Sequence, residues 1–417
     1  MNIKTGYKQT EIGVIPDDWE VKKLGDILKV IGGGAFKSAD SQSSGIKWLK
    51  IANVDINRIV WNDESYLPSE LIKNNENFLL NSGDYVIALT RPILGKKLKI
   101  AQLNNEDVPA LLNQRVGKIA VENGNDLNFT YFLFQKDEII NALAQSMAGT
   151  DPPNLSNRGI YNIDCAVPSS KQEQTAIASA LSDVDALMGE LDKLIAKKRD
   201  IKQATMQQLL TGKKRLAGFS GEWEVKRLGD IAEIDPENLN SSTSPEYEFR
   251  YISLEDVDSG TLTNTTEMQF KNAPSRARRK IRKFDVLVST VRPNLQSHLI
   301  IQNEVTDWVC STGFSVVRCK NANAAYIFNH LFASTINRQI DTLITGSNYP
   351  AINSSDVKNL LIPIPPTIEE QIAIATILSD MDAEINALQQ KRDKTAQLKQ
   401  GMMQELLTGR IRLSIKE

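Results

Sequence analysis

An internal repeat covers nearly the whole chain of 417 residues, and it constrains the fold more than any other feature. The segment 18–27 (DWEVKKLGDI) returns at 222–231 (EWEVKRLGDI) with eight identities in ten positions, 204 residues later. Three further segments return: 84–92 at 285–293 after 201 residues, and 173–188 at 370–385 and 206–216 at 403–413, both after 197 residues. Self-similarity of this extent predicts two copies of one structural unit.

The distance between the copies changes along the chain and indicates which parts are rigid. It falls from 204 to 197 residues before position 173 and then stays at 197 as far as 216. Surface loops accept insertions, whereas packed elements do not. Each copy is therefore expected to hold a loop-bearing globule and then a rigid element, with globules at 1–168 and 217–366 and rigid elements at 169–216 and 367–417.

Each rigid element begins and ends with helix signals. Both open on a capping box, Ser or Thr followed three residues later by Glu, at 170–173 and 367–370, with proline just before. Both close on Leu-Leu-Thr-Gly, which supplies a glycine for a left-handed C-terminal cap. No proline lies between these signals, so uninterrupted helices are predicted at about 170–211 and about 367–408.

Apolar residues recur in both predicted helices with alternating steps of four and three, the spacing of a heptad seam. The seam residues are Ile177, Leu181, Val184, Met188, Leu191 and Ile195 in the first helix and Ile374, Leu378, Met381, Ile385 and Leu388 in the second. A helix of about 40 residues is about 60 Å long, and one with a single apolar stripe needs a partner. The other copy is the obvious partner; the alternative is that each helix lies along its own globule.

Connectivity fixes the direction of such a pair. The first helix leaves the first globule and ends at the second, and the second helix leaves the second globule. If the two helices pack together, they must be antiparallel, and an approximate two-fold axis relates the copies. The pairing also predicts that Gly409 and Arg410 lie close to the N-terminal segment.

Both globules are expected to mix α and β structure. Strand-like runs occur at Tyr85–Leu89, Val286–Val291 and Leu299–Ile301, and Gly- and Asn-rich turns are frequent. The predicted fold class is therefore α+β: a tandem pseudo-two-fold repeat of two mixed globules separated by a pair of long antiparallel coiled-coil helices. The detailed topology of each globule stays open at this stage.

Composition narrows the functional classes. Apolar residues make up 41% and charged residues 24%, and no apolar run reaches the roughly 18–20 residues of a membrane span. The N-terminus lacks the apolar core of a signal peptide, and Cys165, Cys310 and Cys319 form no metal-binding or disulfide pattern, so a cytoplasmic location is expected. Two histidines, His298 and His330, are too few for a His-rich metal centre.

Several segments imitate catalytic motifs without their essential residues. Asp151-Pro-Pro-Asn154 resembles the Asp-Pro-Pro-aromatic loop of adenine methyltransferases, but the aromatic that stacks on the flipped base is missing. Its counterpart at 348–351 departs in the same way, and no Gly-x-Gly turn suits a methyl donor. We therefore interpret these segments as repeat loops.

The remaining imitations are weaker. The Glu-x-Lys sequences at 20–22 and 224–226 resemble the end of a nuclease site but lack an acidic partner strand, so a first strand anchored by Trp19 or Trp223 is the favoured interpretation. The Gly-Lys-Lys at 212–214 lacks the Ser or Thr of a phosphate loop. The chain is therefore predicted to be non-catalytic, without a catalytic or metal-binding residue of its own.

Basic clusters are the remaining candidates for chemistry. They are predicted to contact DNA through Arg91, Lys96, Lys97, Lys99, Arg276, Arg278, Arg279, Lys280, Arg282, Lys283 and Arg292. No acid lies within the run 276–283, and like charges repel unless an anion meets them. Arg91 and Arg292 each follow a strand-like run and precede proline, which suits a phosphate or a base edge. The alternatives are a solvated face for the run and a local carboxylate pair for each arginine.

Neither globule is basic overall, which limits how such patches work. Residues 1–168 carry 18 basic and 20 acidic side chains, and residues 217–366 carry 15 and 17. Nucleic-acid binding would therefore depend on local patches, with much of the phosphate affinity supplied by partner subunits.

The paired motifs resemble the specificity subunits of Type I restriction–modification systems. The resemblance rests on W-E-V-K-x-L-G-D-I, on a proline-containing entry before E-Q-x-x-I-A-x-x-L-S-x-x-D, and on a helix ending L-L-T-G, each present twice. It covers essentially the whole chain, although the entry at 167–170 is poorer in proline than that at 363–367. It implies that each globule is a target-recognition domain reading one half of a bipartite, asymmetric DNA sequence.

The resemblance also implies partners and cofactors. The helices would act as the spacer and dock two modification subunits, which bind S-adenosylmethionine, while separate restriction subunits use ATP and Mg²⁺ to cut DNA. No cofactor is expected in this chain itself. The open alternatives are a coiled-coil scaffold without DNA binding and the recognition module of an ATP-independent restriction–modification enzyme.

Overall fold

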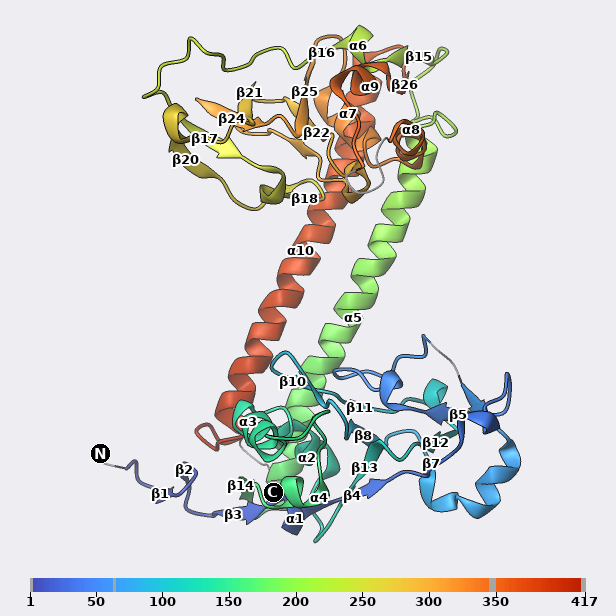
Figure 1. Cartoon of the computed structure of the whole chain (residues 1–417), viewed down its shortest axis with the longest axis vertical. Coiled ribbons are helices and arrows are strands. Elements are labelled where there is room, and N and C mark those ends of the chain that lie inside the picture. Colours follow the sequence, from blue (N-terminus) through green and yellow to red (C-terminus); the bar gives the residue numbers. More distant parts are fainter. Residues whose placement is uncertain (1–2, 63–64, 345–349, 414–417) are drawn as a thin grey trace. The chain divides into compact units, whose positions relative to one another are not determined.

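A computed structural model describes residues 3–62, 65–344 and 350–413, in two compact units (Figure 1). Unit 1 comprises residues 1–190 and 392–417, and unit 2 comprises residues 191–391. The unit boundaries fall inside the two long helices, so each unit contains part of both. The domain boundaries predicted from the sequence keep each long helix in a single segment. They therefore describe the sequence repeat and not these two compact units.

Two four-stranded sheets form the globule of unit 1. The first has the order β11-β8-β13-β4, with antiparallel neighbours. The second has the order β6-β5-β12-β7, in which β12 runs parallel to β5. The strands are β4 Leu28–Gly32, β5 Ile46–Leu49, β6 Tyr66–Leu67, β7 Leu79–Leu80, β8 Tyr85–Ala88, β11 Ile100–Gln102, β12 Ala110–Leu112 and β13 Val116–Val121.

Unit 2 repeats both sheets in the same order. They are β16-β25-β22-β23 and β20-β17-β24-β21, and β17 again runs parallel to β24. The strands are β16 Ala232–Ile234, β17 Glu248–Ile252, β20 Thr266–Gln269, β21 Ala277–Ile281, β22 Val286–Ser289, β23 Leu299–Ile300, β24 Trp308–Ser311 and β25 Phe314–Cys319. The predicted strand runs correspond to β8, β22 and β23, so these predictions are confirmed.

Two-stranded ribbons complete the β structure. Unit 1 contains β1 Tyr7–Thr10 with β2 Gly13–Pro16, β3 Trp19–Lys23 with β14 Asp164–Pro168, and β9 Ile93–Leu94 with β10 Lys97–Leu98. Unit 2 contains β15 Glu224–Arg227 with β26 Leu361–Ile364, and β18 Val257–Asp258 with β19 Thr261–Leu262. Trp19 is fully buried at the start of β3, as the strand-anchor interpretation predicts.

Short helices occupy matching positions in the two units. They are α1 Leu24–Ile27, α2 Leu127–Leu133, α3 Asp137–Ser146 and α4 Asn157–Tyr161 in unit 1, and α6 Leu228–Ile231, α7 Ala324–His330, α8 Ser334–Leu343 and α9 Ser354–Asn359 in unit 2. Asp126 caps α2 and Asn323 caps α7, because each side chain accepts the backbone N–H three residues later. The N–H of each cap residue in turn donates to a glutamine of a long helix, Gln174 or Gln371.

The two long helices are α5 Lys171–Leu209 and α10 Ile368–Leu406, each of 39 residues and within two residues of the prediction at both ends. Gly212 and Gly409 follow them with φ of +68° and +70°, the predicted left-handed caps. The capping boxes are only partly present. Thr367 accepts the N–H of Glu370, but the Glu370 carboxylate binds Arg215 instead of returning to the cap.

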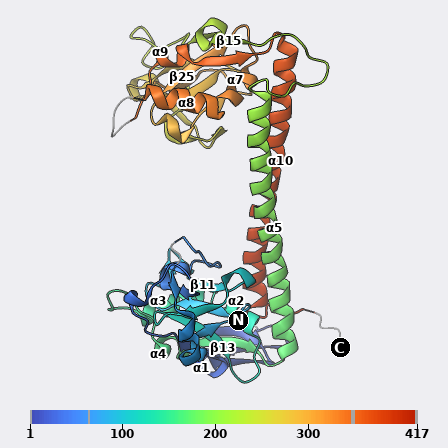
Figure 2. The ribbon, with the colours of Figure 1, turned by 90° about the vertical axis from the view of Figure 1, so that its right-hand side faces the viewer.

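The helix segments within each unit are antiparallel, as predicted. In unit 2, Lys198 pairs with Glu384 at 2.6 Å and Lys202 pairs with Asp382 at 2.5 Å, so rising numbers in α5 meet falling numbers in α10. In unit 1, Lys399 pairs with Asp185 at 2.8 Å, and this pair is the repeat counterpart of Lys202–Asp382. Figures 1 and 2 show the two segments side by side in each unit.

The seam residues are all buried or half-buried, but they serve two kinds of contact. Ile177 and Leu181 belong to the core of the unit 1 globule together with Leu406 and Leu407 from the end of α10. Ile374, Ala375 and Leu378 pack in the same way in unit 2 with Met206, Leu209 and Leu210 from the end of α5. The first turns of each helix therefore lie on their own globule, as the alternative proposed, while the other helix completes that core.

Candidate nucleic-acid interface

A rigid turn carries Arg91 in unit 1 and Arg292 in unit 2. We call the residues 89–92 and 290–293 the arginine elbows. Both arginines have a left-handed backbone, with φ of +48° and +49°, a conformation that costs energy for any residue with a Cβ. The elbow lies at the end of β8 or β22 and leads directly into a buried proline. The sequence located this position, but not its unusual backbone.

A second loop holds each elbow in place. The N–H of Arg91 donates to the carbonyl of Pro153, and the N–H of Arg292 donates to that of Pro350, both at 2.8 Å. In unit 1 the hydroxyl of Thr90 also donates to the side chain of Asn154 at 3.0 Å. The loop that imitates a methyltransferase motif is therefore the clamp of the elbow. Its counterpart at 348–351 lies partly outside the described residues.

The Arg91 side chain stands at the wall of a cavity of about 920 Å³ within unit 1. Among the residues that the structure describes, no hydrogen bond or ion pair engages its guanidinium. The same cavity is lined by polar side chains and by apolar ones, including Asp55, Arg58, Lys99, Ile93, Met147 and Thr150. Arg58 pairs with Asp55 at 2.9 Å. Hydrogen bonds from the backbone of Ile56 and from Arg58 lower the pKa of Asp55, so this carboxylate is ionised at neutral pH.

The lysines that follow Arg91 do not all share its environment. Lys96 and Lys97 are exposed at the β9–β10 turn and line a different groove, of about 1,080 Å³, between the unit 1 globule and its helix segments. Neither ammonium has a partner among the described residues. Lys99 is exposed in part and donates to the carbonyl of Ile51 at 3.3 Å. The predicted run is therefore split between two faces.

The basic run 276–283, which we call the β21 cluster, is largely neutralised in space. Arg279 is half-buried and forms an ion pair with Asp235. Arg282 pairs with Glu237 at 2.5 Å, and Lys283 pairs with Glu304 at 2.9 Å. No acid lies within the run itself, but acids from segments distant in sequence pair with these three cations. Burial opposes ionisation of Glu237, but hydrogen bonds from Arg318 and Arg282 lower its pKa.

Two other members of the β21 cluster remain accessible. Arg276 is exposed and Lys280 half-buried, and neither side chain has a partner within the described parts of the chain. Arg278 donates to the carbonyl of Ala277 at 2.8 Å and lies over the ring of Phe270, 4.8 Å from its centre. DNA contact by these residues stays a prediction. The structure favours Arg276 and Lys280 over Arg279, whose ion pair has a structural role.

The segments that imitate a nuclease site, the cysteine and the candidate metal ligands have the following surroundings in the structure. Glu20 pairs with Lys22 at 2.8 Å and Glu224 with Lys226 at 2.9 Å, so both Glu-x-Lys sequences form surface ion pairs. Burial raises the pKa of Cys165 to about 12, which makes its thiol a poor nucleophile. The described residues contain no cluster of three or more His, Cys, Asp or Glu suited to a metal ion.

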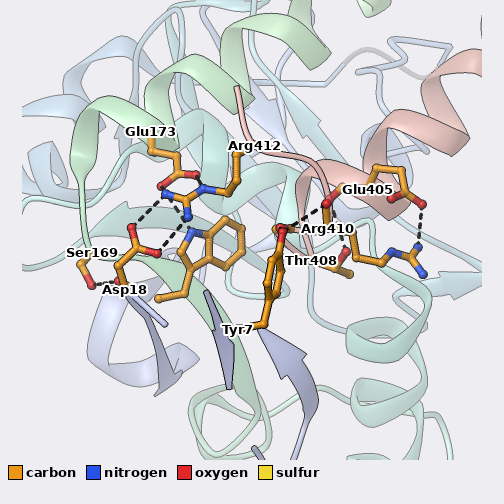
Figure 3. Close-up of polar contacts among 10 residues, drawn as sticks. Tyr7, Asp18, Ser169, Glu173, Glu405, Thr408, Arg410 and Arg412 are labelled. Carbon is orange, nitrogen blue, oxygen red and sulfur yellow. Dashed lines mark hydrogen bonds and ion pairs between the residues drawn. The ribbon is translucent and has the colours of Figure 1, made fainter. Parts of the chain in front are cut away.

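Sequence reasoning missed one pair of residues, Arg412 and Arg215. Arg412 binds the buried carboxylate of Glu173 and also Asp18, the latter through two hydrogen bonds of 2.9 Å (Figure 3). Arg215 binds the buried carboxylate of Glu370 at 2.6 and 2.7 Å. We call these two sites the arginine joints. The signal was available, since Arg412 and Glu173 are each 197 residues from their counterparts.

The unit 1 joint brings an N-terminal segment, residues 7–18, beside a C-terminal segment, residues 409–412. The hydroxyl of Tyr7 donates to the carbonyls of Gly409, at 2.9 Å, and Arg410, at 3.2 Å (Figure 3). The prediction that Gly409 and Arg410 lie near the N-terminal segment is therefore confirmed.

A helix able to span a membrane does not occur in the part of the chain that the structure describes.

Comparison with known proteins identifies relatives of both copies. The family model of the Type I restriction modification DNA specificity domain matches residues 16–202 and again residues 220–400. The MjaVIII specificity subunit of Methanocaldococcus jannaschii is 36% identical over 215 residues, which span 51% of this chain and 50% of that relative. The putative MjaX specificity subunit of the same organism is 25% identical over 98% of this chain and 97% of its own length.

A solved structure extends the likeness to the whole fold. The S subunit of a Type I restriction–modification system from M. genitalium matches with a TM-score of 0.61, covering 100% of this chain and 99% of that one. The sequences are only 12% identical, so this likeness concerns the fold alone.

Proposed function

Because the chain belongs to the family of Type I restriction modification DNA specificity domains, we propose that it is the subunit that recognises DNA sequence in such a complex. Unit 1 reads one half of a bipartite target and unit 2 reads the other. The observation that carries this proposal is the repetition of one clamped arginine elbow, Arg91 and Arg292, on matched sheets of the two units.

The cationic side chains have a division of labour in this proposal. Arg276, Lys280, Lys96 and Lys97 contact phosphates, which position the protein without naming bases. The paired cations of the β21 cluster maintain the sheet that carries them. Since both globules carry more acidic than basic residues, partner subunits supply much of the phosphate affinity.

We further propose that catalysis belongs entirely to partners. Two modification subunits bind S-adenosylmethionine and dock on the long helices, and restriction subunits use ATP and Mg²⁺. The specificity subunit itself holds no cofactor. The purified chain should therefore show no methyl transfer to DNA, and methylation should require the modification subunit and S-adenosylmethionine together.

A duplication experiment tests whether each unit reads one half-site. In each globule a backbone hydrogen bond of 2.8 Å joins the first and last residues of the part to be exchanged. The N–H of Leu24 donates to the carbonyl of Ile163 in unit 1, and that of Leu228 donates to the carbonyl of Leu360 in unit 2. Residues 228–360 are replaced by residues 24–163, and the complex with the modification subunit is selected against a random DNA library. The two half-sites should become inverted copies of one sequence. An unchanged, asymmetric target would refute the proposal.

A second experiment tests whether the helices set the spacer. Seven residues, one heptad, are removed from α5 at 190–196 and from α10 at the matched positions 387–393, which keeps the seam in phase. The helices shorten by about 10 Å, so the gap should shorten by about three base pairs while both half-sites stay the same. Changed half-sites with an unchanged gap would contradict the proposal.

A further inference from the structure

We infer that Arg91 reads the edge of a guanine in the half-site bound by unit 1. This inference rests on the proposed function and adds a base and a residue to it. Arginine recognises guanine by two parallel hydrogen bonds to O6 and N7 in the major groove. Such a contact requires a guanidinium that is accessible and held at a defined place.

The backbone of the elbow meets the second requirement. A left-handed backbone at a residue with a side chain persists only where the surroundings enforce it. Here the N–H of Arg91 donates to the carbonyl of Pro153 at 2.8 Å. The next residue, Pro92, has a φ fixed by its ring, and its carbonyl accepts the N–H of Lys99 at 2.7 Å. On the other side Leu155 donates to Leu89 at 2.7 Å. A contact to phosphate, which tolerates a mobile cation, does not need this degree of restraint.

The surroundings of Arg91 favour a base over a phosphate. Its cavity also contains Asp55, whose carboxylate is paired with Arg58 at 2.9 Å and can still accept a hydrogen bond from a base amino group. Apolar side chains such as Ile93 and Met147 complete the lining. Mixed donors, acceptors and apolar walls suit a base edge, whereas a row of cations suits the DNA backbone.

Other cations predicted from the sequence do not combine these properties. Arg279 is accessible only in part and is bound to Asp235. Lys96 and Lys97 are free but lie on a two-residue strand and its turn, with no clamping loop beside them among the described residues. Arg91 is both free in its side chain and fixed in its backbone, which is the combination that base recognition requires.

The test uses the specificity subunit in complex with its modification subunit and selection from a random duplex library. We expect Arg91→Gln to reduce discrimination at one G·C pair of one half-site by about 5- to 150-fold, with a shift toward adenine, which glutamine recognises. The rest of that half-site and the whole other half-site should keep their preferences.

Controls separate the other outcomes. Lys96→Gln should weaken binding to all sequences equally and lower the slope of log affinity against log salt by about 0.9. The same uniform loss in Arg91→Gln would make Arg91 a phosphate contact and overturn the inference, as would an unchanged target. Arg91→Ala removes the donors altogether and serves if Arg91→Gln fails to fold; its failure to alter any single base pair would also overturn the inference. A wild-type complex with no sequence preference would instead refute the proposed function.

Discussion

The two arginine joints are built from the same residues but differ in how the chain reaches them. In unit 2, Arg215 lies on the covalent link between α5 and β15, and it binds the carbonyls of Gly221 and Ser220 in that link as well as Glu370. In unit 1 the segments that meet at the equivalent position, residues 7–18 and 409–412, lie nearly 400 residues apart in the sequence. There Arg412 binds Asp18 in addition to Glu173.

This difference shows how one fold is closed with and without a peptide connection. The covalent link keeps Arg215 near Glu370, so this joint does not depend on an added ion pair. The unit 1 joint must bring together segments nearly 400 residues apart, and it does so with an added ion pair and with the hydrogen bonds from Tyr7 to Gly409 and Arg410. The hydrogen bonds from Arg412 lower the pKa of Asp18, so the added pair is charged at neutral pH.

The largest effect should come from breaking the unlinked joint. Arg412→Ala leaves Glu173, whose side chain is 2% exposed, as a buried charge without a cation, at a cost of about 3–5 kcal/mol. Hydrogen exchange should then accelerate in β3, in the first turns of α5 and in the C-terminal segment, but not in the globule of unit 2. Arg412→Ala with Glu173→Gln should recover much of this protection, because the uncompensated charge is gone.

The matched variant Arg215→Ala sharpens the comparison. It leaves Glu370 unpaired in the same way, with 1% of its side chain exposed. Because the covalent link still holds residues 210–223 beside the unit, exchange should accelerate locally around Glu370 without release of the segment. Equal release of both segments would show that the link contributes nothing to the joint.

A second difference between the units is that both histidines lie in unit 2. Burial lowers the pKa of His298 to about 4 and that of His330 to about 3, against an ordinary value near 6.5. The unfolded chain therefore binds protons below pH 6.5 that the folded unit refuses. Its unfolding free energy should be largest above pH 6.5 and fall by about 2 kcal/mol per histidine between pH 7 and pH 5.

Hydrogen exchange at several pH values, corrected for the intrinsic rate, measures this loss for each unit separately. Unit 1 contains no histidine and should lose stability only at lower pH, where its paired carboxylates become protonated. The variant His330→Phe should flatten the response of unit 2, because it removes a group with two buried and unpaired nitrogens. A response of equal size in both units between pH 7 and pH 5 would contradict this assignment to the histidines.

The β21 cluster separates cations that hold the fold from cations that are free to bind. Arg279→Ala should destabilise unit 2 by about 2–3 kcal/mol, because it leaves the half-buried carboxylate of Asp235 without a cation. Arg276→Ala and Lys280→Ala together should change stability by less than about 0.5 kcal/mol. In the assembled complex they should lower the salt slope of DNA binding by about 0.9 for each phosphate that is no longer neutralised. Unchanged stability together with an unchanged salt slope would restore the solvated-face interpretation for Arg276 and Lys280.

The repeat made the architecture predictable from the sequence to an unusual degree. A fixed distance of 197 residues, two caps and a heptad pattern are local signals, and they located both long helices within two residues. The sheet order was not predictable, because strands such as β12 and β5 pair over some 60 residues without a local mark. The partners of the cations were missed for the same reason, since Asp235 follows β16 of one sheet and Arg279 lies in β21 of the other.

Site prediction succeeded where the repeat and the backbone coincided. Arg91 and Arg292 were selected because both copies have arginine before proline, and the structure adds the shared left-handed backbone. The β21 cluster was selected on charge alone, and three of its six cations proved to be paired with acids. Charge density in a sequence thus says little until the acids that fold against it are known.

The smallest expected effect concerns one turn that differs between the units. Gly83 in unit 1 and Phe284 in unit 2 precede the matched aspartates of β8 and β22, and both have a left-handed backbone, with φ of +90° and +66°. Phe284 is 56% exposed, so its ring gains little from burial, whereas a left-handed backbone costs a residue with a Cβ about 1–2 kcal/mol. Phe284→Gly should therefore stabilise unit 2 by about 0.5–1 kcal/mol, after the entropy of the added glycine is deducted. Phe284→Ala separates strain from the loss of the ring, because it removes the ring but keeps the Cβ. Chemical denaturation followed by hydrogen exchange in β22 should show a gain for glycine and none for alanine; equal gains would mean that the ring, and not the backbone, is the source of the cost.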